Sequence, residues 1–250
     1  NTFDPLTTLG YLAAVTERIG LGTSVLIVPY RNPIATAKML ATLDQLSGGR
    51  VIVVVGTGWQ EPEFDALGVP YAERGPRTDE YLDVWRACWA EDPVSFSGKF
   101  VNFDQMHCSP KPVQKPHPPI WVGGSSRPAL RRAAKYGEVW QPVPSTLDAM
   151  QASKAYIEEQ CERIGRVTPP SIRMSFRVNF SSITGVKNIG ADGKRLRGHG
   201  TAEEVANDMR EFRDAAGVEA FQINFNGCPS LGQLYEQMDM FMADVKPALA

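Results

Sequence analysis

Cysteine and histidine are scarce in this sequence, and neither residue type has the spacing of a metal site. The 250 residues include four cysteines and three histidines, with no CxxC pair and no HxxxH pair. Zinc sites need closely spaced ligands of these types, so we predict no metal site. So few cysteines in a chain of this length are typical of a reduced, cytoplasmic protein.

Long hydrophobic runs and a strong excess of one charge are also missing. No apolar run approaches the roughly 20 residues of a membrane span, and no signal-peptide pattern opens the chain. The formal net charge is -2, which gives no bulk attraction to nucleic acid or to an anionic membrane. The composition, 43% hydrophobic and 22% charged, is that of a soluble globular protein. We therefore expect neither nucleic acid nor a membrane as partner.

The most informative stretch runs from Arg50 to Trp59. It holds five consecutive β-branched residues, Val51 to Val55, followed by Gly56-Thr57-Gly58. An apolar run without alternation predicts a strand buried on both faces, as in parallel sheets covered by helices. The glycines come where this strand ends, and they let a ligand approach the backbone closely, although a tight turn is the simpler interpretation.

Predicted strands and helices alternate along the whole chain. Six core strands are expected near residues 22–28, 51–56, 119–123, 138–142, 172–180 and 220–225. Helical patterns lie at residues 4–18, 32–49, 77–89, 127–136, 147–164, 201–216 and 231–245. Residues 60–75 and 181–200 are predicted as loops, residues 96–103 as a hairpin, and residues 109–119 as an extended proline-rich crossing.

This alternation is the signature of βαβ units and a parallel sheet. Small residues at several strand ends favour an α/β fold of the TIM (β/α)8 barrel type, with the first two βα units absent from this chain. A doubly wound sheet is the alternative. No change of composition marks a boundary, so residues 1–250 are predicted to form a single domain whose N-terminal part is missing.

A second strand end carries Gly123-Gly124-Ser125-Ser126 directly before a predicted helix. Backbone N–H groups at a helix N-terminus form an anion site, and the hydroxyls of Ser125 and Ser126 could add two donors. Alternatively, Ser126 simply caps the helix. A GxGxxG fingerprint is absent, because Gly20-Leu21-Gly22 begins a strand instead of following one. A nicotinamide-binding Rossmann fold is therefore not favoured.

Carboxylates and tryptophans near the strand ends are further candidates. Glu61 and Glu63 follow the glycines of the Val51 strand and could act as acid or base, although solvated loop carboxylates need no function. Trp59, Trp121 and Trp140 each fall close to a strand end. They could wall a flat ring system, or equally fill the mouth of the barrel.

Two other features carry weaker signals. Lys187, Lys194, Arg195 and Arg197 form a basic loop, which is most often solvated but could also meet an anionic cofactor tail. Cys228 follows the last strand with no histidine near it in sequence, so a turn cysteine is the favoured interpretation. No GxSxG elbow is present, and nucleophilic catalysis finds little support.

Five segments of the chain together have a pattern found in a known family. They read LGTSVLIVPYRNPIATAKMLATLDQLSGGRVIVVVGTGWQEPEFDALG, RTDEYLDVWRACW, FSGKF, SPKPVQKPHPPIWVGG and GTAEEVANDMREFRDAAGVEAFQINF. On these segments the chain resembles the luciferase-like monooxygenase superfamily, and most closely its coenzyme F420-dependent oxidoreductases. The resemblance extends from Asp4 to Val245, and its most specific block is Leu21 to Gly58.

The resemblance implies a TIM barrel with a flavin or deazaflavin ring at its C-terminal mouth. It places a non-prolyl cis peptide bond, which forms a bulge behind the ring, at Ser24-Val25. The glycines after the Val51 strand would line the ring and tail, and the Gly123 loop would hold the cofactor phosphate. The predicted cofactor-binding residues are Ser24, Val25, Gly56, Thr57, Gly58, Trp59, Gly123, Gly124, Ser125 and Ser126.

The sequence departs from the family pattern in two ways. Family members normally begin with two further βα units that end in an Asp-His or similar pair near the ring, whereas this chain starts after them. We expect about 50–70 additional N-terminal residues, sized as two units of about 30 residues each, and we assign no catalytic residue. The sugar-phosphate dehydrogenase branch carries a Glu after its GTG, where this chain has Trp59, which argues against a sugar-phosphate substrate.

The resulting hypothesis is an enzyme that transfers a hydride between coenzyme F420 and a small organic substrate. A reduced-FMN monooxygenase is the first alternative, with FMN as cofactor. A non-catalytic flavin-binding family member is the second, and a TIM-barrel enzyme that binds a substrate phosphate at Gly123 is the third. The resemblance also implies a homodimer, and isologous pairing is the commonest arrangement in general.

Overall fold

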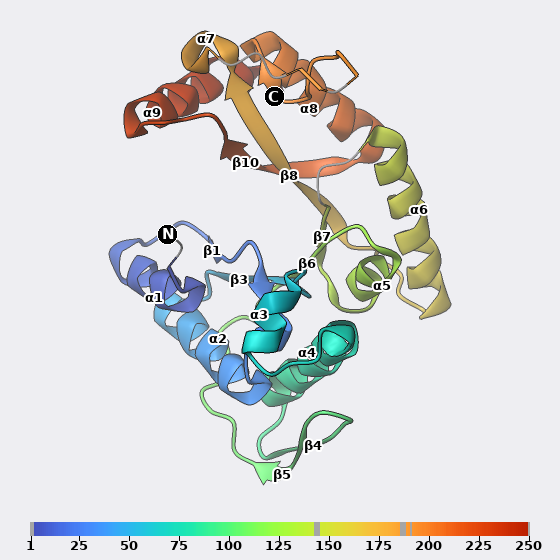
Figure 1. Ribbon diagram of the computed structural model, residues 1–250. Coiled ribbons are helices and arrows are strands. Elements are labelled where there is room, and N and C mark those ends of the chain that lie inside the picture. Colours follow the sequence, from blue (N-terminus) through green and yellow to red (C-terminus); the bar gives the residue numbers. More distant parts are fainter. Residues whose placement is uncertain (1–2, 143–145, 186–188, 191, 250) are drawn as a thin grey trace. The chain divides into compact units, whose positions relative to one another are not determined.

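The structure is a computed structural model that describes residues 3–142, 146–185, 189–190 and 192–249 (Figure 1). The chain divides into two compact units. The first comprises Asn1–Trp140 with Gln160–Pro170, and the second comprises Gln141–Glu159 with Ser171–Ala250. Each unit is described by itself, and the single barrel domain expected from the sequence stays a prediction.

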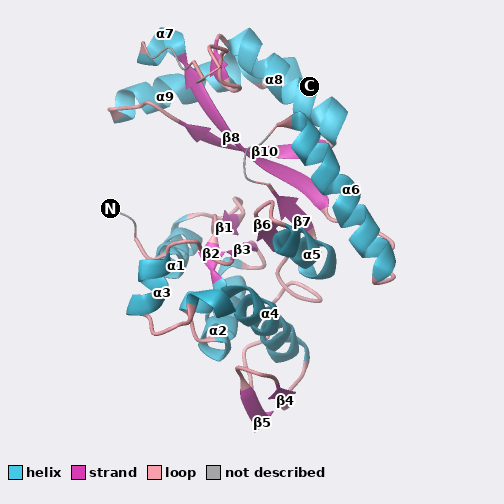
Figure 2. Cartoon of the chain, turned by 45° about the vertical axis from the view of Figure 1, so that its right-hand side comes forward, coloured by secondary structure: helices cyan, strands magenta, loops and turns pink. Residues whose placement is uncertain are grey.

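The first unit is built on parallel strands with helices between them (Figure 2). Its helices are α1 (Pro5–Val15), α2 (Pro33–Ser47), α3 (Glu61–Ala66), α4 (Arg74–Ala90) and α5 (Arg127–Tyr136). Its strands are β1 (Leu21–Gly22), β2 (Leu26–Ile27), β3 (Val51–Gly56), β4 (Val94–Ser97), β5 (Asn102–Met106), β6 (Ile120–Gly123) and the start of β7 (Val139–Gln141). The order is β1-β3-β6-β7, and β2 also pairs with β3.

The predicted buried strand is confirmed as β3. Val53 and Val55 are fully buried, and Val51 is 1% exposed. Strands β1, β2 and β6 all pair with β3 in parallel. Leu26 of β2 and Val122 of β6 both stand opposite Val55 of β3. The carboxyl ends of three strands therefore lie at one edge of the sheet, where ligands bind in parallel α/β folds.

The predicted hairpin is also present, as antiparallel strands β4 and β5. Glu80 of α4 holds its turn by accepting hydrogen bonds of 2.7–2.8 Å from the backbone N–H groups of Lys99, Phe100 and Val101. Helix α4, predicted at residues 77–89, buries an apolar face on which Trp85 is fully enclosed. This face anchors α4 against α2, and the hairpin extends from its C-terminal end.

Two predictions about local structure in the first unit were wrong in part. The strand expected near residues 22–28 is split into β1 and β2 by residues 23–25, and the Ser24-Val25 peptide bond is cis, as predicted. The loop expected at residues 60–75 contains α3, which begins at Glu61 with Pro62 next to it. Proline suits the first helical turn, and the buried Phe64 anchors this short helix against the rings of Tyr30 and Tyr71.

The second unit contains a long parallel pair of strands. Its elements are β8 (Ser171–Phe180), α7 (Ser181–Thr184), β9 (His199–Gly200), α8 (Ala202–Ala216), β10 (Val218–Phe225) and α9 (Leu231–Met240), and α6 (Leu147–Arg163) precedes them. Strand β8 pairs in parallel with β10 and β9. A capping box at Thr201 opens α8, where the sequence predicted a helix from residue 201. Residues 181–200 were predicted as loop, but α7 and β9 form within them.

A search of the described ranges finds no helix whose length and hydropathy would let it span a membrane. Within the same ranges, no group of three or more His, Cys, Asp or Glu side chains has the arrangement of a metal site.

Asp4 joins the start of α1 to the segment after β2. Its carboxylate accepts a 2.9 Å hydrogen bond from the Thr7 N–H and pairs with the Arg31 guanidinium. The Thr7 N–H, followed by Arg31, lowers the pKa of Asp4 from 3.8 to about 2. Because the folded-state pKa is the lower one, this stabilisation is present above about pH 4 and is lost as the pH falls through about 2.

We expect Asp4→Asn to lose this pH-dependent contribution. Asparagine still caps the helix, so the cost at pH 7 is below about 1 kcal/mol, as is usual for an ion pair whose carboxylate is partly exposed. Urea unfolding between pH 5 and pH 2 provides the measurement. The free energy of unfolding of the variant should fall less steeply than that of the wild type over this range, and parallel curves would contradict the assignment.

Candidate active site

The ends of strands β3 and β6 meet under one side chain, that of Val25. A Cβ atom added at Gly56 would lie 2.7 Å from Val25 Cγ2, and one added at Gly123 would lie 3.1 Å from Val25 Cγ1. Both strand ends therefore need glycine for Val25 to sit over them. The side chain is 39% exposed, so it presents an apolar surface at the carboxyl edge of the sheet.

The segment between β1 and β2 is tied to β3 just before Val25. The buried Thr23 donates a 2.8 Å hydrogen bond from its hydroxyl to the carbonyl of Val54. Ser24 and Val25 follow at the surface, joined by the cis peptide bond. Two predicted site residues thus lie at the same sheet edge as Gly56.

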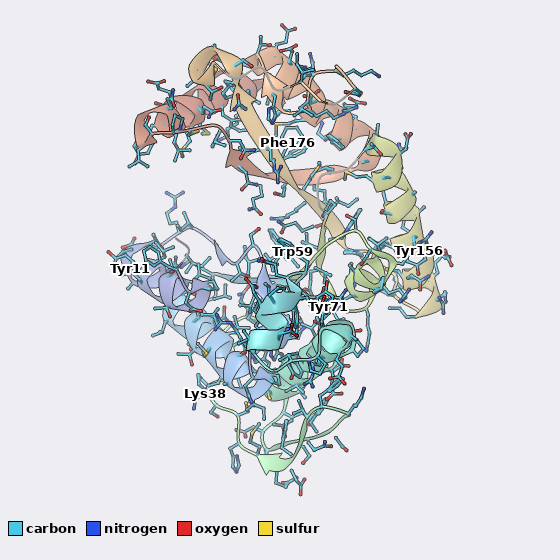
Figure 3. The ribbon with its side chains drawn as sticks, in the orientation of Figure 1. Tyr11, Lys38, Trp59, Tyr71, Tyr156 and Phe176 are labelled. Carbon is cyan, nitrogen blue, oxygen red and sulfur yellow. The ribbon has the colours of Figure 1, made fainter. Side chains whose placement is uncertain are left out.

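The loop after β3 presents Trp59 to solvent. Gly58 has a φ of 76°, and an added Cβ would lie 2.8 Å from Ile27 Cγ2 and 3.0 Å from the Phe64 ring. The Trp59 carbonyl accepts a 3.1 Å hydrogen bond from the Tyr71 hydroxyl, and its indole is 77% exposed (Figure 3). Thr57, between the two glycines, is half-buried. The backbone is thus fixed while the indole remains available to a ligand.

The Gly123 loop leads directly into helix α5. Gly124 has a φ of 104°, and its carbonyl accepts a 2.8 Å hydrogen bond from the indole of the buried Trp140. The Ser126 hydroxyl accepts from the Ala129 N–H at 3.4 Å, so Ser126 caps α5. Ser125 is exposed in front of this helix end.

Arg127 was missed by the sequence analysis. It is exposed at the first position of α5, immediately after the predicted phosphate loop. Its guanidinium adds a positive charge where the N-terminal N–H groups of the helix already favour an anion. Pro128 has no N–H, so the backbone of this helix offers fewer donors than most. The GGSSR run, read as a whole, was the signal that could have identified Arg127.

A pocket of about 400 Å³ lies beside Val25. Its walls are formed by Pro5, Val25, Leu26, Ile27, Tyr30, Arg31 and Leu67. The Tyr30 hydroxyl donates a 2.5 Å hydrogen bond to Glu63, one of the predicted acid or base candidates. Burial, followed by this carboxylate, raises the pKa of Tyr30 to about 12. Tyr30 therefore keeps its proton at neutral pH, and Glu63 is engaged as its acceptor.

The arginines of the predicted basic loop form ion pairs within the second unit. Arg195 makes two hydrogen bonds of 2.7 and 2.8 Å to Asp208, and Arg197 pairs with both carboxylate oxygens of Glu211. These pairs tie the loop to α8, which favours a structural role over contact with a cofactor tail. Lys187 lies outside the described residues.

Comparison with known proteins identifies the family. The sequence profile of the luciferase-like monooxygenases matches residues 1–183. The chain belongs to the luciferase-like monooxygenase family. Its similarity to solved structures covers nearly every residue. Monooxygenase RslO1 from Streptomyces bottropensis has a TM-score of 0.83 at 24% identity, covering 99% of this chain and 83% of that chain.

A second luciferase-like structure agrees with this match. The coenzyme F420-dependent tetrahydromethanopterin reductase from Methanopyrus kandleri has a TM-score of 0.81 at 18% identity, covering 100% of this chain and 89% of that chain. At such identities these structures bear on the fold alone. With the family match they confirm the predicted α/β fold of the TIM (β/α)8 barrel type over the doubly wound alternative.

Curated relatives of this luciferase-like chain are more similar in sequence. An uncharacterised protein of Mycobacterium tuberculosis is 40% identical over 148 residues, which are 59% of this chain and 52% of the relative. An FMNH2-dependent dimethylsulfone monooxygenase of Pseudomonas putida is 36% identical over 155 residues, which are 61% of this chain and 42% of the relative. The chain spans about half the length of the curated relatives it matches.

Proposed function

We propose that the protein is an oxidoreductase that binds a flavin-type ring against Val25 and a cofactor phosphate at residues 124–127. The observation that carries this proposal is the convergence of Val25 with Gly56 and Gly123 at the carboxyl ends of parallel strands. Because the chain belongs to a family of redox enzymes with this fold, we propose a ring cofactor as the ligand of this sheet edge.

The residues at the strand ends fit a flat ring. The two glycines leave room for Val25 alone, so the surface offered to a ligand is apolar and has no projecting polar group at Gly56 or Gly123. Trp59 adds an exposed indole on the next loop, and aromatic side chains pack well against planar rings. Burial of the ring between such surfaces would exclude water from one of its faces.

The residues before α5 fit a phosphate group. Gly124 turns the backbone through a positive φ, which is strained for residues with a side chain. The Ser125 hydroxyl, the backbone N–H groups of the loop and the Arg127 guanidinium are donors of the kind that phosphate oxygens accept from. The Ser126 hydroxyl already accepts a hydrogen bond from the Ala129 N–H. Ser126 therefore supports the site by capping α5.

Coenzyme F420 with a small organic substrate is our proposal for the reaction. A bound deazaflavin would supply two-electron hydride chemistry, while the chain binds it, orients it and excludes water. Tyr30 holds its proton on the hydroxyl beside Val25, with Glu63 as acceptor. This pair is positioned to fix a polar group of a ligand in the adjoining pocket.

A reduced-FMN monooxygenase is the second candidate. One specific observation favours it, the 36% identity with an FMNH2-dependent dimethylsulfone monooxygenase. Strand ends that accept a deazaflavin ring would also accept an isoalloxazine ring, since both are flat tricyclic systems. A flavin-binding member without turnover is the third reading of the same site.

Cofactor titration separates the first two candidates, and turnover of the bound, reducible cofactor across a substrate panel separates both from the third. The purified protein would be titrated with F420, FMN and reduced FMN, and with the forms of F420 and FMN that lack the phosphate, following fluorescence quenching. We expect saturable binding of one phosphorylated cofactor, tighter than its dephosphorylated form by about tenfold or more, since charge-assisted hydrogen bonds to phosphate are lost. Preference for FMN would overturn the F420 proposal, and failure of every cofactor to bind would overturn the proposed function.

We further propose that the protein is cytoplasmic and works as a homodimer on a small-molecule substrate. All four cysteines are free thiols, which fits a reducing compartment. Isologous dimers are the commonest oligomers of soluble proteins. Sedimentation equilibrium of the purified protein provides the check, and a mass equal to that of one chain would contradict the dimer.

A further inference from the structure

Strand β8 has two different faces. Met174, Phe176 and Val178 are 3% exposed or less, and the Phe176 ring packs edge-on against Phe212 of α8 at 6.1 Å. Phe221 of β10 joins the same cluster. Helices α8 and α9 lie on this side of the β8–β10 pair (Figures 1 and 2), so this is the face that the helices cover.

The opposite face of the pair is polar. This polar face carries Arg173, Ser175 and Arg177 of β8, with Gln222 and Asn224 of β10. Gln222 stands opposite Ser175 and Asn224 opposite Arg177 in the parallel register. None of its alternating positions, 173 to 179 on β8 and 220 to 224 on β10, holds Asp or Glu. Two guanidinium groups therefore share this face with no carboxylate of their own strands.

The neutral side chains of the polar face are held in place. Asn224 donates a 2.8 Å hydrogen bond from its amide to the Ser175 hydroxyl. Gln141, at the end of β7, donates a 2.7 Å hydrogen bond to the side-chain carbonyl of Gln222. These contacts fix a row of amide and hydroxyl groups beside the arginines.

The side chain of Arg177 makes no hydrogen bond or ion pair with any part of the chain that the structure describes, and it is exposed. The charge of Arg177 also affects His199 on the neighbouring β9. Burial lowers the pKa of His199 most, followed by the positive charges of Arg177 and Arg195. In a (β/α)8 barrel the helix-free face of each strand points inward, and bulky branched apolar residues normally fill it. An exposed arginine on this face, with no carboxylate partner among the described residues, can pair with an anion from outside the chain.

We infer that the polar face binds an oxyanion group of the substrate, a carboxylate, sulfonate or phosphate, with Arg177 as its charged donor. The planar guanidinium of Arg177 matches the paired oxygens of such groups, and the Asn224 amide opposite it lies within the same row. The inference rests on the proposed oxidoreductase function. It adds that the substrate of this enzyme carries an anionic group.

A matched pair of probes tests this inference. Pentanesulfonate and pentanol share their alkyl chain, so calorimetric titration of both isolates the contribution of the anionic head. We expect the wild type to bind pentanesulfonate more tightly than pentanol, and Arg177→Gln to weaken sulfonate binding by about tenfold or more. Arg177→Lys should retain part of the affinity, since it keeps the charge without the planar fork.

The control is Arg86→Gln on α4, which removes one exposed arginine elsewhere. If Arg86→Gln weakened pentanesulfonate binding as much as Arg177→Gln does, the loss would be explained by net charge alone, and the inference would be overturned. Absence of sulfonate binding by the wild type would overturn it as well. A parallel titration with F420 and FMN identifies the source of the anion: unchanged cofactor affinity in Arg177→Gln supports a substrate group, whereas a loss would assign the polar face to a cofactor tail and contradict us.

This design keeps the two proposals separable. If neither cofactor binds the wild type but pentanesulfonate binding depends on Arg177, the redox proposal fails and the oxyanion site stands. If a cofactor binds and pentanesulfonate does not, the proposed function stands and the anionic substrate is excluded.

Discussion

Gly56→Ala is expected to weaken binding of the preferred cofactor by about tenfold or more. The added methyl group would lie 2.7 Å from Val25 Cγ2, closer than nonbonded carbon atoms approach one another. Val25 must then move away from the strand ends, and the surface proposed for the ring moves with it. Overpacking of this kind costs about 1–3 kcal/mol, so the free energy of unfolding should fall by a similar amount.

The matched control for this variant is Gly10→Ala. Gly10 lies in α1, and an added Cβ there meets no atom within 4 Å. Alanine in a helix interior is favoured over glycine by roughly 0.5–1 kcal/mol, so this variant should be as stable as the wild type or more so. Cofactor affinity should be unchanged in Gly10→Ala, as measured by fluorescence titration.

A double variant separates steric conflict from other causes. Val25→Ala removes the methyl groups that a side chain at Gly56 would meet. Adding it to Gly56→Ala should restore much of the lost stability without restoring cofactor affinity, because the apolar surface is itself reduced. Full affinity in Gly56→Ala would contradict the position of the ring.

Arg50→Ala is expected to produce the largest loss of stability, about 3 kcal/mol in the free energy of unfolding. The Arg50 guanidinium donates to the carbonyls of Ala13, Thr16, Ile19 and Ser47 and to the Thr16 hydroxyl, at 2.7–3.1 Å. Carbonyls at the end of α1 have no partner within the helix. Alanine would leave them without these donors.

Two further variants make the Arg50 prediction specific. Arg50→Lys keeps the charge but lacks the planar set of donors, so it should lose most of the same stability. Arg86→Ala, on an exposed face of α4, should change the free energy of unfolding by less than about 0.5 kcal/mol. Urea unfolding monitored by tryptophan fluorescence gives all three values. A loss below about 1 kcal/mol for Arg50→Ala would show that water replaces the guanidinium without cost.

The sequence predicted most of the regular structure because strong local signals coincide there. Asn32 and Pro33 open α2, and Gly48, with a φ of 66°, ends it. Thr201 and Glu204 form the complete capping box that starts α8. At such positions local hydrogen bonding and backbone freedom decide the boundary, and no distant contact is required.

The errors lie where contacts between distant residues decide the structure. Helix α3 forms in a predicted loop because Phe64 is buried against Tyr30, with ring centroids 4.8 Å apart, and against Tyr71. A pattern of six residues with one buried side chain is too short to distinguish from a loop. The same limit hid the Tyr30–Glu63 pair, whose partners are 33 positions apart.

The sequence predicted which strand ends form the candidate site, but it did not predict the contacts between the residues of that site. Glycines after the buried strands pointed to Gly56 and Gly123, but nothing in the sequence showed that Val25 would cover both. In β8 the alternation identified a strand, whereas the significance of Arg177 depends on the register with β10 and on which face the helices cover. Both facts come from tertiary structure.

A crystal structure of the protein with its preferred cofactor tests the central claim most directly. We predict that the ring lies in contact with Val25 and that the phosphate lies within hydrogen-bonding distance of Ser125 or of the backbone N–H groups of residues 124–127. A ring that makes no contact with Val25, or a phosphate bound by Arg177 on the β8–β10 pair, would contradict the account.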